Sequence, residues 1–225
     1  MFQQRTKTCT QHTVIRNKYI GIDPSINSTG VVIRTCDEDN KEMSIKYYIL
    51  KGDIHATTKS GDAKSPLTKR ELSAAERYDN FNYVVYDKIP VSDDKIKNEM
   101  CKTNSFRSLV AALVNILYKE CADADKVHVV MEGISYGSTI RTSSVFDLAG
   151  LNYMIRDAVI GLFDYVQGSL VIAPPAHVKK FATGMGNANK ELMVATFKSI
   201  HPEFDIPKLD DVADAFFMSL LAQTT

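Results

Sequence analysis

The sequence predicts a mixed α/β fold, in which a five-stranded sheet of three antiparallel strands followed by two parallel ones has helices on both faces. Near its start, three short strands follow one another through short links, as in an antiparallel meander. Helical and strand-like apolar segments then alternate, which favours parallel strands connected through helices. Apolar residues make up 44% of the chain, enough for a sizeable core, and no linker divides it.

The first half of the chain supplies the meander. Its three strands are short apolar runs bounded by turn residues, expected at 18–24, 28–36 and 43–52. Residues 53–70 are rich in Lys, Thr, Ser, Gly and Asp and are expected to form an exposed loop. Residues 71–89 have helical character with several aromatic side chains, so we expect a helix there.

The second half of the chain supplies the parallel strands and most of the helices. Two apolar runs predict strands at 126–132 and 169–173. Apolar residues at helical spacing predict helices at 105–121, 143–166, 189–200 and 210–223. We therefore expect one domain over 18–225, with a polar basic leader at 1–17 and an insertion at about 53–104.

The charge of the chain is balanced overall but uneven along its length. Lys plus Arg and Asp plus Glu number 27 each, so the total charge does not announce a polyanionic partner. Residues 1–18 carry basic side chains and no acid, and residues 174–198 carry one glutamate and the lysines Lys179, Lys180, Lys190 and Lys198. Basic segments combined with an acidic cleft fit a nucleic-acid enzyme, whereas solvated surface lysines are the alternative.

The spacing of the cysteines and the length of the apolar runs indicate in which cellular compartment the protein acts. The four cysteines have no C-x-x-C spacing, which argues against a disulfide framework and a zinc site. The first eighteen residues are too polar for a signal peptide, and no apolar run is long enough to span a membrane. We therefore expect a reducing, cytoplasmic setting without a membrane partner.

Four acidic residues are placed where one metal site would need them. Asp23 and Glu132 each end an apolar run that reads as a buried strand, and Asp211 and Asp214 share one face of the final predicted helix. Carboxylates gathered in one cleft repel each other unless they hold a hard cation, for which Mg²⁺ is the natural choice. Such clusters commonly cut phosphodiesters, with Asp23 able to bridge two cations.

Each acid also has a simpler interpretation. A single Asp at the end of a strand is usually a turn residue, and Asp210 or Asp211 alone would be an ordinary cap of the helix. Asp210 is a rival to Asp211 as third ligand, since Asp210 and Asp214 also share a helix face.

At this point the chain resembles the RuvC family of Holliday junction resolvases, within the ribonuclease-H-like superfamily. Four blocks carry the resemblance in the family's order: Gly21-Ile22-Asp23-Pro24 with Thr29-Gly30, the strand ending at Glu132, residues 173–191, and Asp211-Val212-Ala213-Asp214-Ala215. The resemblance implies that Asp23, Glu132, Asp211 and Asp214 are metal ligands. It also implies that Lys190 approaches the scissile phosphate and that Lys179 contacts the DNA backbone.

Other residues between these blocks are candidate DNA contacts. Gly184 and Gly186 precede a helix and can present backbone N–H groups to a phosphate, although a glycine stop of the preceding helix is the alternative. Lys180 adds charge beside them. Tyr136 and Arg141 follow Glu132 in a loop, where Tyr136 is either a stacking platform for a base or a packed tyrosine.

The leading prediction is an endonuclease that resolves four-way DNA junctions by paired symmetric nicks, acting as a homodimer with two Mg²⁺ per active site, for which Mn²⁺ substitutes. The apolar helix at 143–166 is the expected dimer interface, with core packing as the alternative reason for its apolar character. The long 53–104 segment and the unusual loop after Glu132 suggest a divergent phage or viral member of the family, in a bacterial or virus-infected cell.

Three alternatives to this function are a broader nuclease for flaps and forks, an actin-like ATP-binding domain, and a non-catalytic DNA-binding module. Pro24 and the chain length argue against the ATP-binding domain, and the intact acids argue against the binding module.

Overall fold

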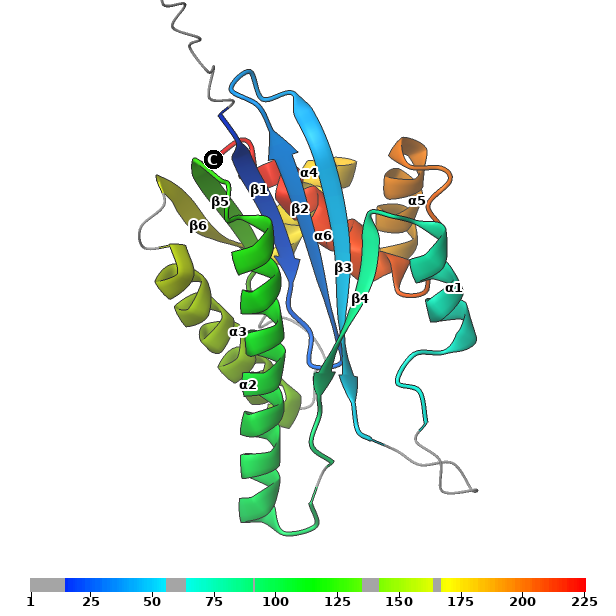
Figure 1. The fold of residues 1–225 in the computed structure, drawn as a ribbon, viewed down its shortest axis with the longest axis vertical. Helices are drawn as coiled ribbons and strands as arrows, with labels where there is room; N and C mark the ends of the chain where they lie inside the picture. The colour runs from blue at the N-terminus through cyan, green and yellow to red at the C-terminus, as the bar shows by residue number, and fades with distance from the viewer. Residues whose placement is uncertain (1–14, 56–63, 91, 135–141, 164–166) are drawn as a thin grey trace, which may run out of the picture.

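A six-stranded mixed sheet forms the centre of the molecule (Figure 1). The computed structural model describes residues 15–55, 64–90, 92–134, 142–163 and 167–225. The strands are β1 (Asn17–Asp23), β2 (Ser28–Cys36), β3 (Glu42–Asp53), β4 (Phe81–Asp87), β5 (Lys126–Glu132) and β6 (Gln167–Ala173). Their order across the sheet is β4-β3-β2-β1-β5-β6.

Strand directions follow the predicted pattern. β1, β2 and β3 pair antiparallel, and β5 and β6 continue from β1 in parallel. β1 and β2 occupy the middle of the sheet and are buried almost throughout, as expected for strands covered on both faces. The predicted mixed sheet of antiparallel strands followed by parallel ones is therefore confirmed, with one strand more than expected.

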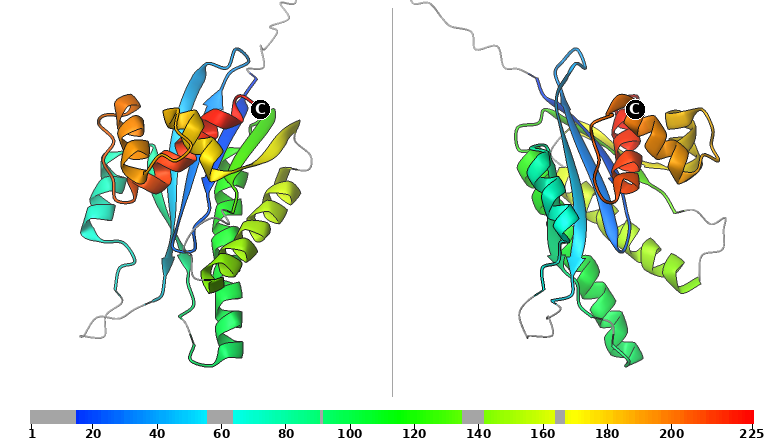
Figure 2. Two further views of the ribbon diagram at one scale, coloured as in Figure 1. Left: turned by 180° about the vertical axis from the view of Figure 1, so that it is seen from behind. Right: turned by 90° about the vertical axis from the view of Figure 1, so that its right-hand side faces the viewer.

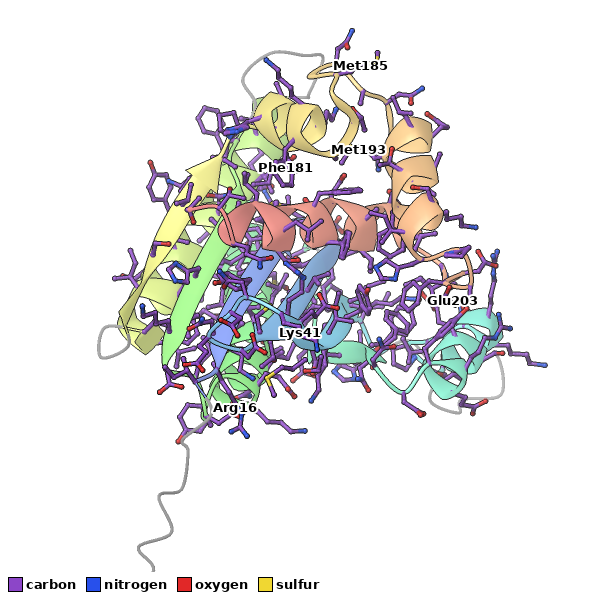
Figure 3. All side chains as sticks on the ribbon, turned by 90° about the horizontal axis from the view of Figure 1, so that it is seen from above. Arg16, Lys41, Phe181, Met185, Met193 and Glu203 are labelled. Carbon is purple, nitrogen blue, oxygen red and sulfur yellow. The ribbon has the colours of Figure 1, made fainter. Side chains whose placement is uncertain are left out.

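Helices cover both faces of the sheet (Figure 2). The six helices are α1 (Lys69–Arg77), α2 (Lys95–Glu120), α3 (Thr142–Phe163), α4 (Pro175–Thr183), α5 (Lys190–Ile200) and α6 (Leu209–Ala222). The apolar side chains form two clusters, one beneath α2 and α3 and one beneath α4, α5 and α6. Figure 3 shows α6 lying across the sheet, with α4 and α5 outside it.

The additional strand corrects the prediction of a helix over 71–89. The helix α1 ends at Arg77, and residues 81–87 instead form β4, which pairs in parallel with β3 at the edge of the sheet. Three aromatic residues (Phe81, Tyr83 and Tyr86) and two β-branched ones within seven positions suit a strand better than a helix. The aromatic side chains that made this segment ambiguous are therefore part of the sheet's edge.

Two other element boundaries differ from expectation. α2 begins at Lys95 rather than 105, because Asp94 caps it by accepting hydrogen bonds from the N–H groups of Ile96 and Lys97. Residues 95–104 are mostly polar and give no apolar stripe. The sequence prediction also omitted α4, which begins directly after Pro174, with Pro175 in the first turn.

The backbone of α6 lies directly on β1 and β2. A Cβ atom added to Gly21 would lie 1.8 Å from the carbonyl oxygen of Ala215, and one added to Gly30 would lie 2.3 Å from that of Asp211. Both distances are far inside van der Waals contact, so only glycine fits. This close approach fixes the position of the first turns of α6 over the end of β1. Across the described residues, no helix is long and apolar enough to cross a membrane.

Candidate active site

Two of the predicted acids lie side by side at one edge of the sheet. Asp23 is the last residue of β1 and Glu132 the last residue of β5. The two strands are parallel, and their register pairs Ile22 with Met131, one residue before each acid. Since parallel strands end at the same edge, the two carboxylates project from neighbouring positions.

The other two acids reach this edge from α6. Asp211 lies in the first turn of the helix and Asp214 one turn further on. The Oγ atom of Ser28 donates a hydrogen bond to Asp211 Oδ2 at 2.5 Å, which ties the helix to the start of β2. Asp214 Oδ1 is buried and has no hydrogen-bond partner. A buried carboxylate oxygen without a donor is costly, and such an atom is a natural place for a ligand.

Burial and the charges of the neighbouring acids raise the pKa values of these groups. Loss of water raises the pKa of Asp23 well above its ordinary value, and the charges of Glu132, Asp214 and Asp211 raise it further. Burial and the charge of Asp214 raise the pKa of Glu132 to about 7. Burial raises the pKa of Asp214 to about 6, although nearby lysines oppose the shift. The cluster therefore lacks enough positive charge to hold four ionised carboxylates.

Two predicted lysines border the cluster. Lys190, at the start of α5, donates from Nζ to Asp210 Oδ2 at 2.6 Å, and its side chain is 73% exposed. Its charge and that of Lys179 on α4 lower the pKa values of Glu132 and Asp214 against the effect of burial. Lys180, next on α4, is exposed. An anionic ligand above the acids would therefore meet Lys179 and Lys190.

Asp210 and Asp211 occupy different environments. Burial disfavours the charged form of Asp210, but the hydrogen bond from Lys190 outweighs this and lowers its pKa. Burial raises the pKa of Asp211, and Asp211 contributes to the raised pKa of Asp23. Asp210 thus already has a counter-charge, whereas Asp211 belongs electrostatically to the group around Asp23. This difference favours Asp211 as the third member of the cluster.

The donor set suits a divalent cation in its chemistry. Carboxylate oxygens are the ligands that Mg²⁺ prefers, and the unpartnered Asp214 Oδ1 is one such oxygen. Among the described side chains, no three Asp, Glu, His or Cys groups already form a set that could hold a metal ion. Side-chain rearrangement is therefore required before a cation can be held by Asp23, Glu132, Asp211 and Asp214.

The turn between α4 and α5 is fixed by hydrogen bonds within the chain. Gly184 ends α4 with φ 78°, and its N–H donates to the carbonyl oxygen of Lys180 at 2.8 Å. The N–H of Met185 donates to Thr183 Oγ1 at 3.1 Å. This geometry is that of a glycine stop, and the Gly184 donor is engaged within the chain, so a phosphate contact at Gly184 stays a prediction. A phosphate contact at Gly186 stays a prediction, and so do the roles of Tyr136 and Arg141, which lie outside the described residues.

Three residues that build the site were not singled out from the sequence. Ser28 anchors Asp211, and Gly21 and Gly30 admit the helix that carries it. Glycine within an apolar strand is a signal of close backbone approach, so both glycines were open to this interpretation. The Ser28 contact joins residues 183 positions apart and has no local signal.

The fold is a mixed α/β sheet with helices on both faces, and an acid cluster lies at one edge of that sheet. No protein-family model and no curated protein sequence matches the chain. A Thermus thermophilus RuvC structure matches with 17% identity and a TM-score of 0.44, covering 92% of each chain.

Two further solved structures are similar to this chain. T. thermophilus RuvC in complex with a Holliday junction substrate matches with 13% identity and a TM-score of 0.45, covering 92% of this chain and 90% of that one. The yeast mitochondrial Holliday junction resolvase matches with 14% identity and a TM-score of 0.44, covering 91% and 76%.

Proposed function

We propose that this protein is a metal-dependent endonuclease that resolves four-way DNA junctions by paired symmetric nicks. The observation that carries the proposal is the gathering of four carboxylates from β1, β5 and α6 at one edge of the sheet, where the charges of Glu132, Asp214 and Asp211 raise the pKa of Asp23 and the charge of Asp214 raises that of Glu132. In a structural ion pair, each acid has a basic partner that balances its charge, whereas these four carboxylates have too few basic neighbours to balance theirs. Such an arrangement is stable in ionised form when divalent cations bind.

The residues have distinct roles in this proposal. Asp23, Glu132, Asp211 and Asp214 would hold two Mg²⁺ ions, which supply Lewis-acid stabilisation and an activated water when bound. Lys190 lies beside the acids and would meet the scissile phosphate, with Asp210 keeping its ammonium group in place. Lys179 would contact a neighbouring phosphate and contribute affinity that depends on salt. Mn²⁺ is expected to substitute for Mg²⁺.

The branched substrate follows from charge and symmetry. A chain with equal numbers of acidic and basic residues lacks a general attraction for duplex DNA, so shape must contribute to its affinity. Paired nicks require two active sites, which a twofold dimer provides. The two sites would then face equivalent strands of a junction.

An apolar stripe on α3 supports the dimer. Phe146, Tyr153 and Ile160 follow one another at seven-residue spacing and are 72%, 64% and 58% exposed. Residues at this spacing lie on one face of a helix, where they form the kind of seam through which two helices pack. An exposed line of large apolar side chains marks an interaction surface rather than a solvated face.

A reducing, cytoplasmic compartment is part of the same proposal. Cys36, Cys101 and Cys121 are free thiols, and Cys36 and Cys121 are buried. Structural thiols of this kind persist where disulfides are not formed.

One experiment tests the function directly. A four-way junction, a linear duplex and a flap, each labelled on one strand at a time, are incubated with the protein in Mg²⁺ and in chelator. We expect Mg²⁺-dependent nicks at symmetric positions on opposing junction strands, with the linear duplex intact. Equal cutting of flaps and junctions would replace the proposal by a broader structure-specific nuclease, and binding without cutting in any cation would replace it by a DNA-binding module.

A further inference from the structure

A small cavity lies beside the turn that follows Asp23. It has a volume of about 170 Å³ and lies between this turn, the end of β4 and the N-terminal half of α2. Apolar walls come from Ile26, Ile89 and Phe106, and Tyr86 adds an aromatic ring. The cavity is therefore on the α2 side of the sheet, next to the edge at which Asp23 ends β1.

The walls of this cavity are held by hydrogen bonds. The Tyr86 hydroxyl donates to the carbonyl oxygen of Ile26 at 3.3 Å, and Lys88 Nζ donates to Asn27 Oδ1 at 2.9 Å. On the opposite wall, the N–H of Ile89 donates to Ser105 Oγ at 2.9 Å. The cavity is thus built between fixed elements.

One polar atom at the cavity has no partner. Asn98 lines it from α2, and Asn98 Oδ1 is buried without a hydrogen-bond donor. An unpaired buried acceptor costs free energy that a ligand N–H group recovers. Lys102 on α2 and Asp147 on α3 also line the cavity and form an ion pair at 3.1 Å, so their charges are already compensated. A ligand that fits this cavity therefore has apolar faces and carries at least one N–H donor on its edge.

The size of the cavity restricts the ligand further. Pockets for drug-sized molecules have volumes of roughly 300–1,000 Å³, whereas a cavity of about 150 Å³ accommodates one benzene ring. A single planar aromatic ring system fits this range. Nucleobases combine such a ring with N–H groups on their edge, and proteins hold unstacked bases between apolar and aromatic side chains.

The cavity is close enough to the acid cluster to receive a base from DNA that is bound there. Ile26 is three residues from Asp23, so the wall lies within roughly 11 Å of the acid cluster along the chain. Lys88 lines the cavity and bonds to the neutral Asn27, and within the described residues it forms no ion pair. Its charge is available to a phosphate. A DNA strand with one phosphate at the acids would bring an adjacent nucleotide to this cavity.

We propose that the cavity captures one unpaired nucleobase next to the scissile phosphate, with Asn98 Oδ1 accepting a hydrogen bond from the base edge. This inference rests on the proposed nuclease function and adds a specificity-determining site to it. Adenine, cytosine and guanine present an exocyclic amine to such an acceptor, whereas thymine has only its ring N–H. Cleavage should therefore favour an amine-bearing base at the captured position.

Cys101 allows a direct test, because it lines the same cavity and is less buried than Cys36 and Cys121. Junctions carry one base with a short disulfide-linked tether, placed in turn at each position near the branch. The protein carries Cys9→Ser, and calcium replaces magnesium so that the DNA stays intact. Attack of the Cys101 thiolate on the tether disulfide forms a protein–DNA disulfide and releases the small thiol. We expect cross-linking at one position next to the cut, and none with Cys101→Ser.

A second measurement tests the role of Asn98 Oδ1, the acceptor without a hydrogen-bond partner. Asn98→Leu keeps the side-chain size and removes the carboxamide, and we expect about a tenfold loss of base preference at the captured position. Asn104→Leu is the matched control, since Asn104 is on the same helix and does not line the cavity. Asn98→Ala repeats the test with a smaller side chain. Unchanged base preference in both Asn98 variants would overturn the inference.

The outcomes separate this inference from the nuclease proposal. Junction cleavage without position-specific cross-linking overturns base capture and leaves the nuclease standing. Position-specific cross-linking in a protein that cuts no DNA supports base capture and removes the nuclease. Equal cross-linking at every position, or equal cross-linking of linear duplex, shows that Cys101 meets DNA without a base-binding site.

Discussion

Lys190 and Asp210 form a 2.6 Å ion pair that links the start of α5 to the start of α6. The pair lies beside the four carboxylates of Asp23, Glu132, Asp211 and Asp214, whose pKa values are all raised. The pKa of Asp210 is instead lowered, because the hydrogen bond from Lys190 outweighs the effect of burial. The ammonium group is thus held at the border of the acid cluster by an acid outside it.

Replacing Lys190 should affect the reaction more than binding. Lys190→Ala is expected to slow single-turnover junction cleavage by about 10²-fold or more, because a contact to the transition state lowers the barrier. Lys179→Ala should mainly weaken binding and reduce its salt dependence. Lys198→Ala, with its partner Asp205 away from the site, is the control. Equal defects in binding alone for Lys190 and Lys179 would contradict this division of roles.

Replacing Asp23 should separate binding from catalysis. Asp23→Asn is expected to abolish cleavage while junction binding stays intact or improves, because a ligand is lost and repulsion of phosphate is relieved. In chelator, the same variant should unfold at a higher temperature than the wild type, because a charge opposed by three others has been removed. Cleavage assays, gel-shift titrations and thermal melts measure the three effects. Wild-type cutting by this variant would contradict the metal assignment.

The contact between Gly21 and α6 should tolerate no side chain. Gly21→Ala places a Cβ atom 1.8 Å from the Ala215 carbonyl oxygen, so the helix must move, and we expect destabilisation of about 3 kcal/mol or more. Gly150→Ala is the control on α3, where a Cβ meets nothing within 4 Å. This control should stabilise the protein by about 0.5–1 kcal/mol. Urea unfolding measures both changes.

The ion pair between Lys51 and Glu71 should make stability depend on pH. Glu71 is buried, yet hydrogen bonds from Lys51 and Thr68 outweigh burial and lower its pKa. A lowered pKa means that the contribution is present above the unfolded-state value of about 4.3 and is lost as pH falls through the folded-state value. Glu71→Gln should cost about 1–3 kcal/mol at pH 7 and less below pH 4. A constant cost across this range, measured by urea unfolding, would refute the prediction.

The stripe on α3 should control the oligomeric state. Phe146→Glu is expected to convert the dimer to a monomer, because a charge would be buried in an apolar seam. Tyr118→Glu is the matched control, since Tyr118 is 70% exposed against 72% for Phe146 and lies on α2 instead. Analytical ultracentrifugation distinguishes the two species. A wild-type protein that is monomeric at high concentration would remove the dimer from the proposal.

The sequence predicted the parts of the site that depend on strand ends and helix spacing. Asp23 and Glu132 follow apolar runs, and Asp211 and Asp214 lie three residues apart on a helix, so local patterns placed them correctly within their elements. That their strands are neighbours was not part of the prediction and is shown by the parallel pairing of β1 with β5. The fold was predictable, since the central strands are strongly apolar.

What the sequence did not reveal depends on contacts between distant segments. Residues 81–87 become a strand because β3 offers them an edge to pair with. Residues 95–104 become helical because Asp94 caps them and the apolar part of α2 continues their helix. The different surroundings of Asp210 and Asp211 arise from Lys190 and Ser28, neither of which is near them in sequence.

The close packing of α6 on Gly21 has a consequence for protein synthesis. Asp23 leaves the ribosome before Asp211 and Asp214, which follow nearly two hundred residues later and reach the edge of the sheet only when α6 docks. A nascent chain that already has β1, β2 and β3 therefore carries an incomplete set of acids. In the proposed nuclease, cutting would begin only after α6 has docked, so chains that end before α6 would lack the activity.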